Sequence, residues 1–219
     1  MPNSPQPNRI DLAKLFGAVT KGLMGQRETL NQADSYNNDH GDNMVQIFEV
    51  ITQAVKEKKG ADPADQLAYA SEILRGRKSG SAQVYANGLA QASQQFQGQP
   101  VTTDNAGMLL KALLGGGQEP TTAPQAQGSA DLLGSLLGGL TGTQSANQQT
   151  DPGMDVGDLL NAGMAYMDAK QRGGSNAEAI VNALISTSPM GQSSHRSQSG
   201  AFVANTIMQV LGSMSRRKP

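Results

Sequence analysis

Residues 34–59 read DSYNNDHGDNMVQIFEVITQAVKEKK, a polar run that changes abruptly into an apolar pattern. From Met44 onward the apolar side chains recur every three or four positions, which is the spacing of one face of an α-helix. These positions are Met44, Ile47, Phe48, Ile51 and Val55. Lysines lie near the end of the pattern, where their positive charge interacts favourably with the negative end of the helix dipole. The stretch therefore predicts an amphipathic helix that follows a polar loop.

The same helical spacing recurs along most of the chain. One helix is predicted from Arg9, capped by Asn8 and with Asp11 in its first turn. Further helices are predicted at 62–75, from 79, at about 104–114, at 155–172, from Ser175 with a capping box, and from about Ser199. No stretch shows the alternating pattern of a β-strand with confidence. The predicted fold class is therefore all-α, with seven or eight helices around one core.

Composition divides the chain into a helical body and an insert. Residues 115–150 consist mainly of Gly, Gln, Thr, Ala and Pro, a composition that does not offset the entropy of ordering. The leucines from Leu132 to Leu140 leave two alternatives, a short amphipathic helix or a linker with an apolar patch. The predicted domains are a disordered 1–8, a helical part 9–114, the flexible low-complexity insert 115–150, the remaining helical part 151–214 and a basic tail 215–219.

Charge and cysteine content exclude several classes of function. The net charge is -1, which lacks the basic surface that a nucleic-acid polymer requires. There is no Cys, so disulfides, thiolate metal sites and cysteine nucleophiles are excluded. The N-terminus resembles neither a signal nor a transit peptide, and no stretch has the roughly 20 apolar residues of a membrane span. We therefore expect a cytoplasmic protein.

The polar run is the strongest chemical signal in the sequence. Carboxylate and amide oxygens crowded before a helix are the ligands that Mg²⁺ prefers, and the helix start offers N–H groups to phosphate. The alternative is a polar turn that only caps the helix. Lys78-Ser79-Gly80-Ser81 is a second segment with small residues at a helix start, which can also hold phosphate through backbone amides.

The order of these segments resembles the DhaL-type domain, the nucleotide-binding subunit of dihydroxyacetone (glycerone) kinases, also known as the Dak phosphatase type. The run from Leu30 through Asp34 to Asp39-His40-Gly41-Asp42-Asn43-Met44 is similar to the first motif of that family. The segment 79–88 is similar to its serine–glycine motif. Arg172-Gly173-Gly174-Ser175 and Gln198-Ser199-Gly200-Ala201 are similar to two later and less specific motifs.

The resemblance implies an antiparallel barrel of about eight helices with Mg²⁺ and ADP or ATP at one end. It places metal at Asp34, Asn37 and Asp39, with Asn37 in place of an aspartate and Asp42 as a candidate replacement carboxylate. The residues it assigns to the nucleotide are His40, Gly41, Asn43, Ser79, Gly80, Ser81 and Ile180. No catalytic residue is predicted. Partners implied are a dihydroxyacetone-binding or acyl-carrying subunit and a second copy of the chain.

Two hypotheses of function remain open. In the first, the chain is a DhaL-like Mg–ADP/ATP-binding domain whose phosphotransferase activity is weakened. Glu178, Ala179, Asn182 and Gln198 differ from the family pattern, which favours the second, a non-catalytic helical binding or scaffold module, with a lipid or acyl chain as one ligand. His40 suits either a place beside the metal or a helix start. His195 is expected in an exposed loop, and no serine–histidine–aspartate arrangement is inferred.

Overall fold

The computed structural model describes residues 9–116, 181, 182, 185, 186, 188, 191 and 193–215. In this part of the chain the regular structure is helical, apart from one isolated β-bridge between Arg9 and Thr102. The helices are α1 (Leu12–Ala33), α2 (His40–Glu57), α3 (Pro63–Arg75), α4 (Gly80–Gln95), α5 (Ala106–Gly115) and α9 (Ser194–Ser215). For this part of the chain the all-α prediction is confirmed, whereas the total of seven or eight helices stays a prediction.

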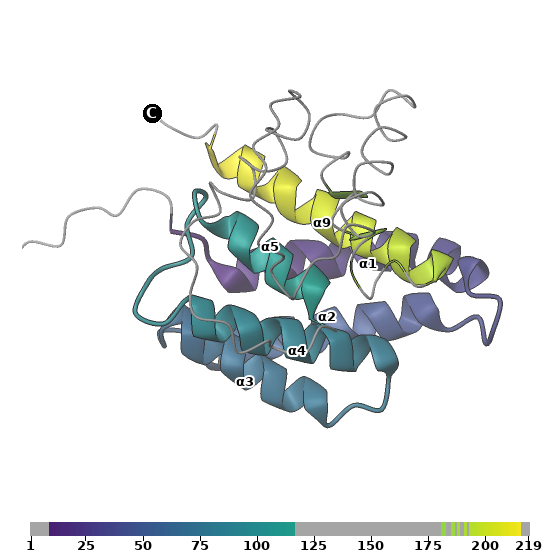
Figure 1. Cartoon of the computed structure of the whole chain (residues 1–219), viewed down its shortest axis with the longest axis horizontal. Coiled ribbons are helices and arrows are strands. Elements are labelled where there is room, and N and C mark those ends of the chain that lie inside the picture. Colours follow the sequence, from purple (N-terminus) through teal and green to yellow (C-terminus); the bar gives the residue numbers. More distant parts are fainter. Residues whose placement is uncertain are drawn as a thin grey trace, which may run out of the picture.

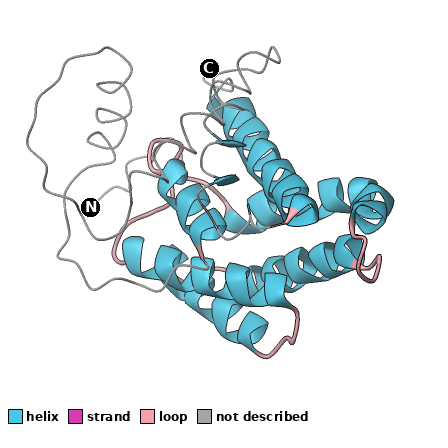
Figure 2. Ribbon diagram, turned by 45° about the vertical axis from the view of Figure 1, so that its right-hand side comes forward, coloured by secondary structure: helices cyan, strands magenta, loops and turns pink. Residues whose placement is uncertain are grey.

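The first four helices form two hairpins that stack on each other. α1 packs against α2, α3 packs against α4, and α2 joins the hairpins by contacting α3 (Figure 1). α5 lies on α4, and α9 lies along α1 on the side away from α3 (Figures 1 and 2). Because α9 also contacts α2, the C-terminal helix reaches the loop that connects α1 to α2.

Three aromatic rings hold the centre of the core. Phe16 and Phe48 lie 6.3 Å apart between ring centroids, and Phe48 meets the ring of Tyr85 edge-on at 5.0 Å. All three side chains are fully buried, and they come from α1, α2 and α4. Burial of each is worth roughly 2–3 kcal/mol in apolar area. Three of the eight aromatic residues of the chain thus meet where the two hairpins pack.

Small residues allow α4 and α5 to approach closely. A Cβ atom on Gly88 would lie 2.5 Å from the carbonyl oxygen of Ala112 and 2.8 Å from the Cα of Leu113. Both are backbone atoms, which cannot move aside as a flexible side chain can. Glycine at this position therefore sets the distance between the two helices.

Two predicted helix starts are wrong. α1 begins at Leu12, not Arg9, because the N–H of Ile10 donates to the Val101 carbonyl at 2.8 Å and holds this segment extended. Asp11 is the cap of α1, and its Oδ1 accepts the N–H of Lys14 at 3.1 Å. α1 continues to Ala33 and ends directly before the polar run. α9 begins at Ser194, five residues before the predicted start.

Several predictions lie outside the described residues. They concern the disordered N-terminus, nearly all of the insert 115–150, the helix at 155–172, most of the helix from Ser175, most of the basic tail, and Ile180. Among the helices that are described, none combines the length and apolar character needed to cross a bilayer.

Candidate functional site

The polar loop between α1 and α2 is short and folded back on itself. The N–H of Asp34 donates to the Asn31 carbonyl at 3.1 Å, and Asp34 Oδ1 accepts the N–H of Tyr36 at 3.1 Å. Asn38 has a φ of 55°, a left-handed conformation that asparagine adopts more readily than most residues. Tyr36 at the tip is 93% exposed. Residues 34–39 therefore form a turn whose shape is fixed by its own backbone contacts.

The first turn of α2 is tied to the loop and to α1. Asn43 Nδ2 donates to Asp39 Oδ1 at 2.6 Å. Asn31 Nδ2 donates to Asp42 Oδ2 at 2.9 Å, and the Asp42 N–H donates back to Asn31 Oδ1 at 3.1 Å. Arg27 adds an ion pair to Asp42 at 3.5 Å. The carboxylate that was the candidate replacement metal ligand thus joins α2 to α1.

Gly41 has a structural role at this junction. A Cβ atom at Gly41 would lie 2.0 Å from the carbonyl oxygen of Arg27 and 2.8 Å from Asn31 Oδ1. No side chain fits in that space, so only glycine lets α2 start this close to α1. The glycine of the predicted nucleotide motif is therefore required by helix packing, whether or not a ligand binds.

A cluster of three buried polar side chains and one partly buried histidine connects the loop to α9. His40 Nε2 lies 2.9 Å from Ser199 Oγ, and the rings of His40 and His195 meet edge-on with centroids 4.7 Å apart. His195 Nδ1 lies 4.0 Å from Asp34 Oδ1. We call these four residues the docking cluster. The expectation that His195 lies in an exposed loop is wrong, because the earlier start of α9 turns this side chain toward Asp34.

The docking cluster shifts the pKa values of its members. Burial is the main cause that lowers the pKa of His40 from 6.5 to about 4; the neighbouring His195 and Arg196 lower it further, while Asp34 opposes them. For Asp34, burial alone would raise the pKa, but the N–H of Tyr36 and the charge of His195 outweigh it and lower the pKa below its ordinary value. At neutral pH His40 is therefore a neutral ring beside an ionised carboxylate.

The cluster contains serine, histidine and aspartate, but its burial argues against nucleophilic catalysis. Ser199 is 0% exposed, and its Oγ also donates to the Arg196 carbonyl at 3.0 Å. A nucleophile must reach the carbonyl or phosphorus atom that it attacks. Since solvent does not reach Ser199, the cluster serves to attach α9 to the loop.

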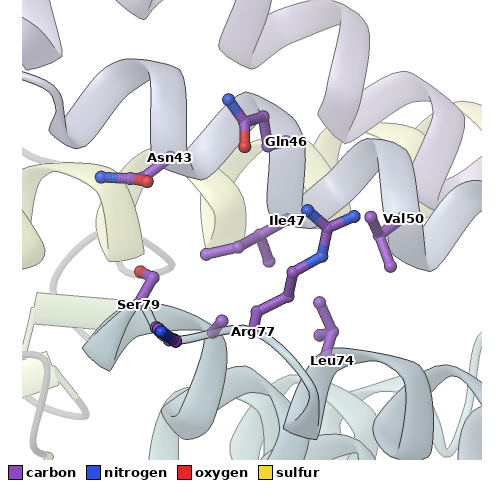
Figure 3. A pocket seen from close by; sticks show the side chains of 9 residues that line it. Asn43, Gln46, Ile47, Val50, Leu74, Arg77 and Ser79 are labelled. Atoms are coloured by element: carbon purple, nitrogen blue, oxygen red, sulfur yellow. The ribbon is translucent and has the colours of Figure 1, made fainter.

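A pocket of about 240 Å³ lies between α2 and the turn that joins α3 to α4. Asn43, Gln46, Ile47 and Val50 line it from α2, and Leu74, Arg77, Lys78, Ser79 and Ala82 line it from the other side (Figure 3). Figure 3 shows Asn43 above Ser79, with the Arg77 side chain reaching across toward α2. Arg77 and Lys78 are exposed, and within the described residues neither forms an ion pair. The pocket thus combines two cations with amide and hydroxyl groups.

The residues predicted to bind a nucleotide fall into three groups. Asn43 and Ser79, which are 36 positions apart in sequence (79 minus 43), line the same pocket. His40 and Gly41 are buried in contacts with α9 and α1. Ser81 is buried in the first turn of α4, and Gly80 faces the Arg196 side chain.

The residues predicted to hold metal are dispersed among local contacts. Asp34 is 4% exposed and belongs to the docking cluster, Asn37 is exposed in the turn, and Asp39 accepts from Asn43. Over the described ranges 9–116 and 181–215, with their gaps, no three His, Asp or Glu side chains form a group that could hold a metal ion. Asp34 is therefore poorly placed to ligate a cation together with Asp39.

Sequence reasoning missed Arg77, Gln46, His195 and Arg196. Arg77 directly precedes the Lys78-Ser79-Gly80-Ser81 segment, so its positive charge could have been added to the predicted phosphate-binding residues. His195 and Arg196 carried no such signal because their place depends on the packing of α9, which the sequence does not reveal.

No family model, curated protein or solved structure matches this chain.

Proposed function

We propose that this chain binds the phosphate groups of a Mg–nucleotide, ADP or ATP, in the pocket between α2 and the α3–α4 turn. The observation that carries the proposal is that Asn43 and Ser79, from two separate candidate motifs, line one pocket together with Arg77 and Lys78. Two motifs that were singled out for phosphate chemistry would have no reason to meet if both were only helix caps.

The chemistry of the pocket supports an anionic ligand. Ser79 is the N-cap of α4 and makes no side-chain capping bond, so its hydroxyl and the first N–H groups of α4 are available to an acceptor. Helix starts bind phosphate through such N–H groups and the positive end of the dipole. Arg77 and Lys78 add charge on the same side. A volume of about 240 Å³ is below the roughly 300–1,000 Å³ of small-molecule pockets, so we assign it to the phosphates rather than the base.

The metal in this proposal arrives with the nucleotide. Asp39 and Asn43, which are hydrogen-bonded to each other beside the pocket, are the residues that would hold it. Mg²⁺ keeps several waters and commonly takes only one or two protein ligands in addition to phosphate oxygens, so two oxygens are enough. When bound, the ion neutralises phosphate charge. Asp34 and Asn37 are not needed for this arrangement.

A non-catalytic binding or scaffold module is the second candidate. The observation in its favour is that Asp34 and His40, which resemble site residues of the kinase subunits, are engaged in attaching α9. With those groups occupied, phosphotransferase activity would be weak or absent. Both candidates share the pocket and differ in whether a bound nucleotide reacts.

The remaining expectations accompany the nucleotide proposal. They are an antiparallel barrel of about eight helices, of which six are described, a cytoplasmic location, and a partner subunit that carries the phosphoryl acceptor or an acyl chain. Dimerisation with a second copy is a further expectation.

Thermal unfolding with and without Mg–ADP tests the proposal. At one hundred times its Kd, a ligand stabilises the folded state by about 2.7 kcal/mol. For a chain of this size that is a rise in Tm of roughly 5–11 °C. Lys78→Gln should weaken the effect, whereas Lys111→Gln, which removes the same charge from an exposed position on α5, should not.

The absence of any shift at millimolar Mg–ADP would refute nucleotide binding. If the shift appears, incubating the bound protein with ATP and following ADP release separates the two candidates. Measurable turnover supports the phosphotransferase, and stable binding without turnover supports the non-catalytic module.

A further inference from the structure

The turn between α3 and α4 carries the two cations of the pocket. Arg77 and Lys78 directly precede Ser79, the N-cap of α4, and all three residues line the pocket. The Arg77 side chain is exposed and reaches across toward α2 (Figure 3). A long side chain loses rotamer freedom when a ligand fixes it, and this cost is smaller where the protein has already restricted it. The way in which the turn is held therefore affects how well Arg77 can bind an anion.

The carbonyl groups of the turn need donors from outside α3. That helix ends at Arg75, and the last carbonyl groups of a helix have no partner within it. The Leu74 carbonyl accepts the N–H of Arg77 at 2.9 Å, which pairs one of them inside the turn. The carbonyl groups of Arg75 and Arg77 lie farther along the chain, and both turn to α4 for a donor.

Gln83 supplies both of these hydrogen bonds. Its side-chain Nε2 donates to the Arg77 carbonyl at 2.6 Å and to the Arg75 carbonyl at 3.3 Å. Its backbone N–H donates to the Ser79 carbonyl at 3.2 Å. One residue in the first turn of α4 thus contacts three alternate residues of the α3–α4 turn, and two of these line the pocket.

The bond to the Arg77 carbonyl restricts the Arg77 side chain as well. The carbonyl and the side chain belong to one residue, so fixing the carbonyl limits the directions in which the side chain can leave the backbone. Gln83 itself is exposed and does not line the pocket. Its influence on a ligand therefore passes through the residues of the turn, and the core does not depend on it.

We infer that Gln83 is a positioning residue of the phosphate pocket, which anchors the α3–α4 turn so that Arg77 is presented to the ligand. The inference rests on the proposed function for the nature of that ligand. It extends the pocket by a residue that touches no ligand, and it predicts that phosphate affinity falls when the amide of Gln83 is removed although both cations remain.

The first test measures binding of Mg–ADP and of inorganic phosphate by calorimetry in the full chain. Gln83→Met keeps the length of the side chain and removes the donor. It should weaken both ligands about three- to tenfold, the effect of one hydrogen bond of ordinary strength. Gln66→Met is the matched control, because Gln66 Nε2 donates in the same way to the Ala61 carbonyl at 2.9 Å, at a turn that does not line the pocket. It should leave both affinities unchanged.

A double-mutant cycle with Arg77→Gln separates positioning from a general loosening of the fold. Residues that act through one another give losses that do not add. In the Arg77→Gln background, Gln83→Met should therefore weaken binding less than twofold. Tm without ligand should fall no further for Gln83→Met than for Gln66→Met. Losses of affinity that add in full, or a larger fall in Tm for Gln83→Met, would assign Gln83 to stability alone and overturn the inference.

The outcomes also separate this inference from the proposed function. Mg–ADP binding that is weakened by Lys78→Gln but unchanged by Gln83→Met overturns the role of Gln83 and leaves the proposed function standing. Inorganic phosphate binding that depends on Gln83 and Arg77, in a protein that does not bind Mg–ADP, supports the inference and overturns the nucleotide. If neither Mg–ADP nor phosphate binds at millimolar concentration, both are refuted.

Discussion

Gly41→Ala should destabilise the protein far more than an ordinary glycine-to-alanine change in a helix. The new Cβ atom would lie 2.0 Å from the Arg27 carbonyl oxygen, and real Cβ contacts are essentially never under 3.0 Å. The backbones of α1 and α2 must therefore separate by about 1 Å, the difference between those two values. That movement also stretches the paired hydrogen bonds between Asn31 and Asp42.

Overpacking of this kind costs typically 1–3 kcal/mol, and we place Gly41→Ala at about 3 kcal/mol because the obstructing atom belongs to the backbone. The corresponding fall in Tm is roughly 6–12 °C. Gly25→Ala in α1 is the matched control, since a Cβ atom there meets nothing within 4 Å. It should gain about 1 kcal/mol from the better helix propensity of alanine.

Urea unfolding followed by circular dichroism measures both variants on one scale. If Gly41→Ala proves as stable as Gly25→Ala, the close approach of α2 to α1 is refuted. A variant that keeps its stability but no longer binds Mg–ADP would assign Gly41 to the ligand instead. The experiment thus distinguishes the packing explanation of the motif glycine from the nucleotide explanation.

Two further variants test the core and the docking cluster. Tyr85→Phe should stabilise the protein by about 1 kcal/mol in urea unfolding, because the buried Tyr85 hydroxyl has no partner; a loss of stability would reveal a hydrogen bond to that hydroxyl. At pH 7 His40 is neutral in the folded protein and mostly neutral in the unfolded chain, because burial lowers its folded-state pKa from 6.5 to about 4. Below pH 6.5 the unfolded chain takes up a proton that folded His40 excludes until about pH 4, so the free energy of unfolding should fall across this window. The lowered pKa of His40 corresponds to at most about 3 kcal/mol in the free energy of unfolding, and solvent screening reduces this to about 1–2 kcal/mol. His40→Gln, which keeps a donor for Ser199, should flatten that part of the pH profile; an unchanged profile would show that His40 is not the titrating group.

The helices and the core were predictable because their signals are local. The stripe from Met44 to Val55 faces the core as its spacing indicates, and Asp62-Pro63 marks the start of α3. The start of α1 was not predictable, because Asn8 and Asp11 are both good caps. The bond from the Ile10 N–H to Val101 decides between them, and a contact between residues 91 positions apart (101 minus 10) leaves no mark on the local pattern.

The candidate site likewise has one part that could be predicted from the sequence and one part that could not. The proximity of Asn43 and Ser79 follows from two helix starts that the sequence identifies separately, although their meeting in one pocket required the packing of α2 against α3. The docking cluster was not predictable at all. His40 and Ser199 are 159 positions apart, and Ser199 looks like one more hydroxyl in a serine-rich stretch until α9 lies against the loop.

The residues that resemble a nucleotide-binding motif are weaker evidence for phosphate binding than the cations that line the pocket. Gly41 is required by α1, Asp42 is paired with Arg27 and Asn31, and Asp34 and His40 attach α9. Each of these residue types therefore has a structural reason to be present even in a protein that binds nothing. Arg77 and Lys78, which line the pocket, have no such contact, since neither forms an ion pair within the described residues. Cations beside a helix start raise the energy of the free protein, and an anion removes that cost. Phosphate binding in this pocket accordingly depends on Arg77 and Lys78, and removal of their charges is the decisive perturbation.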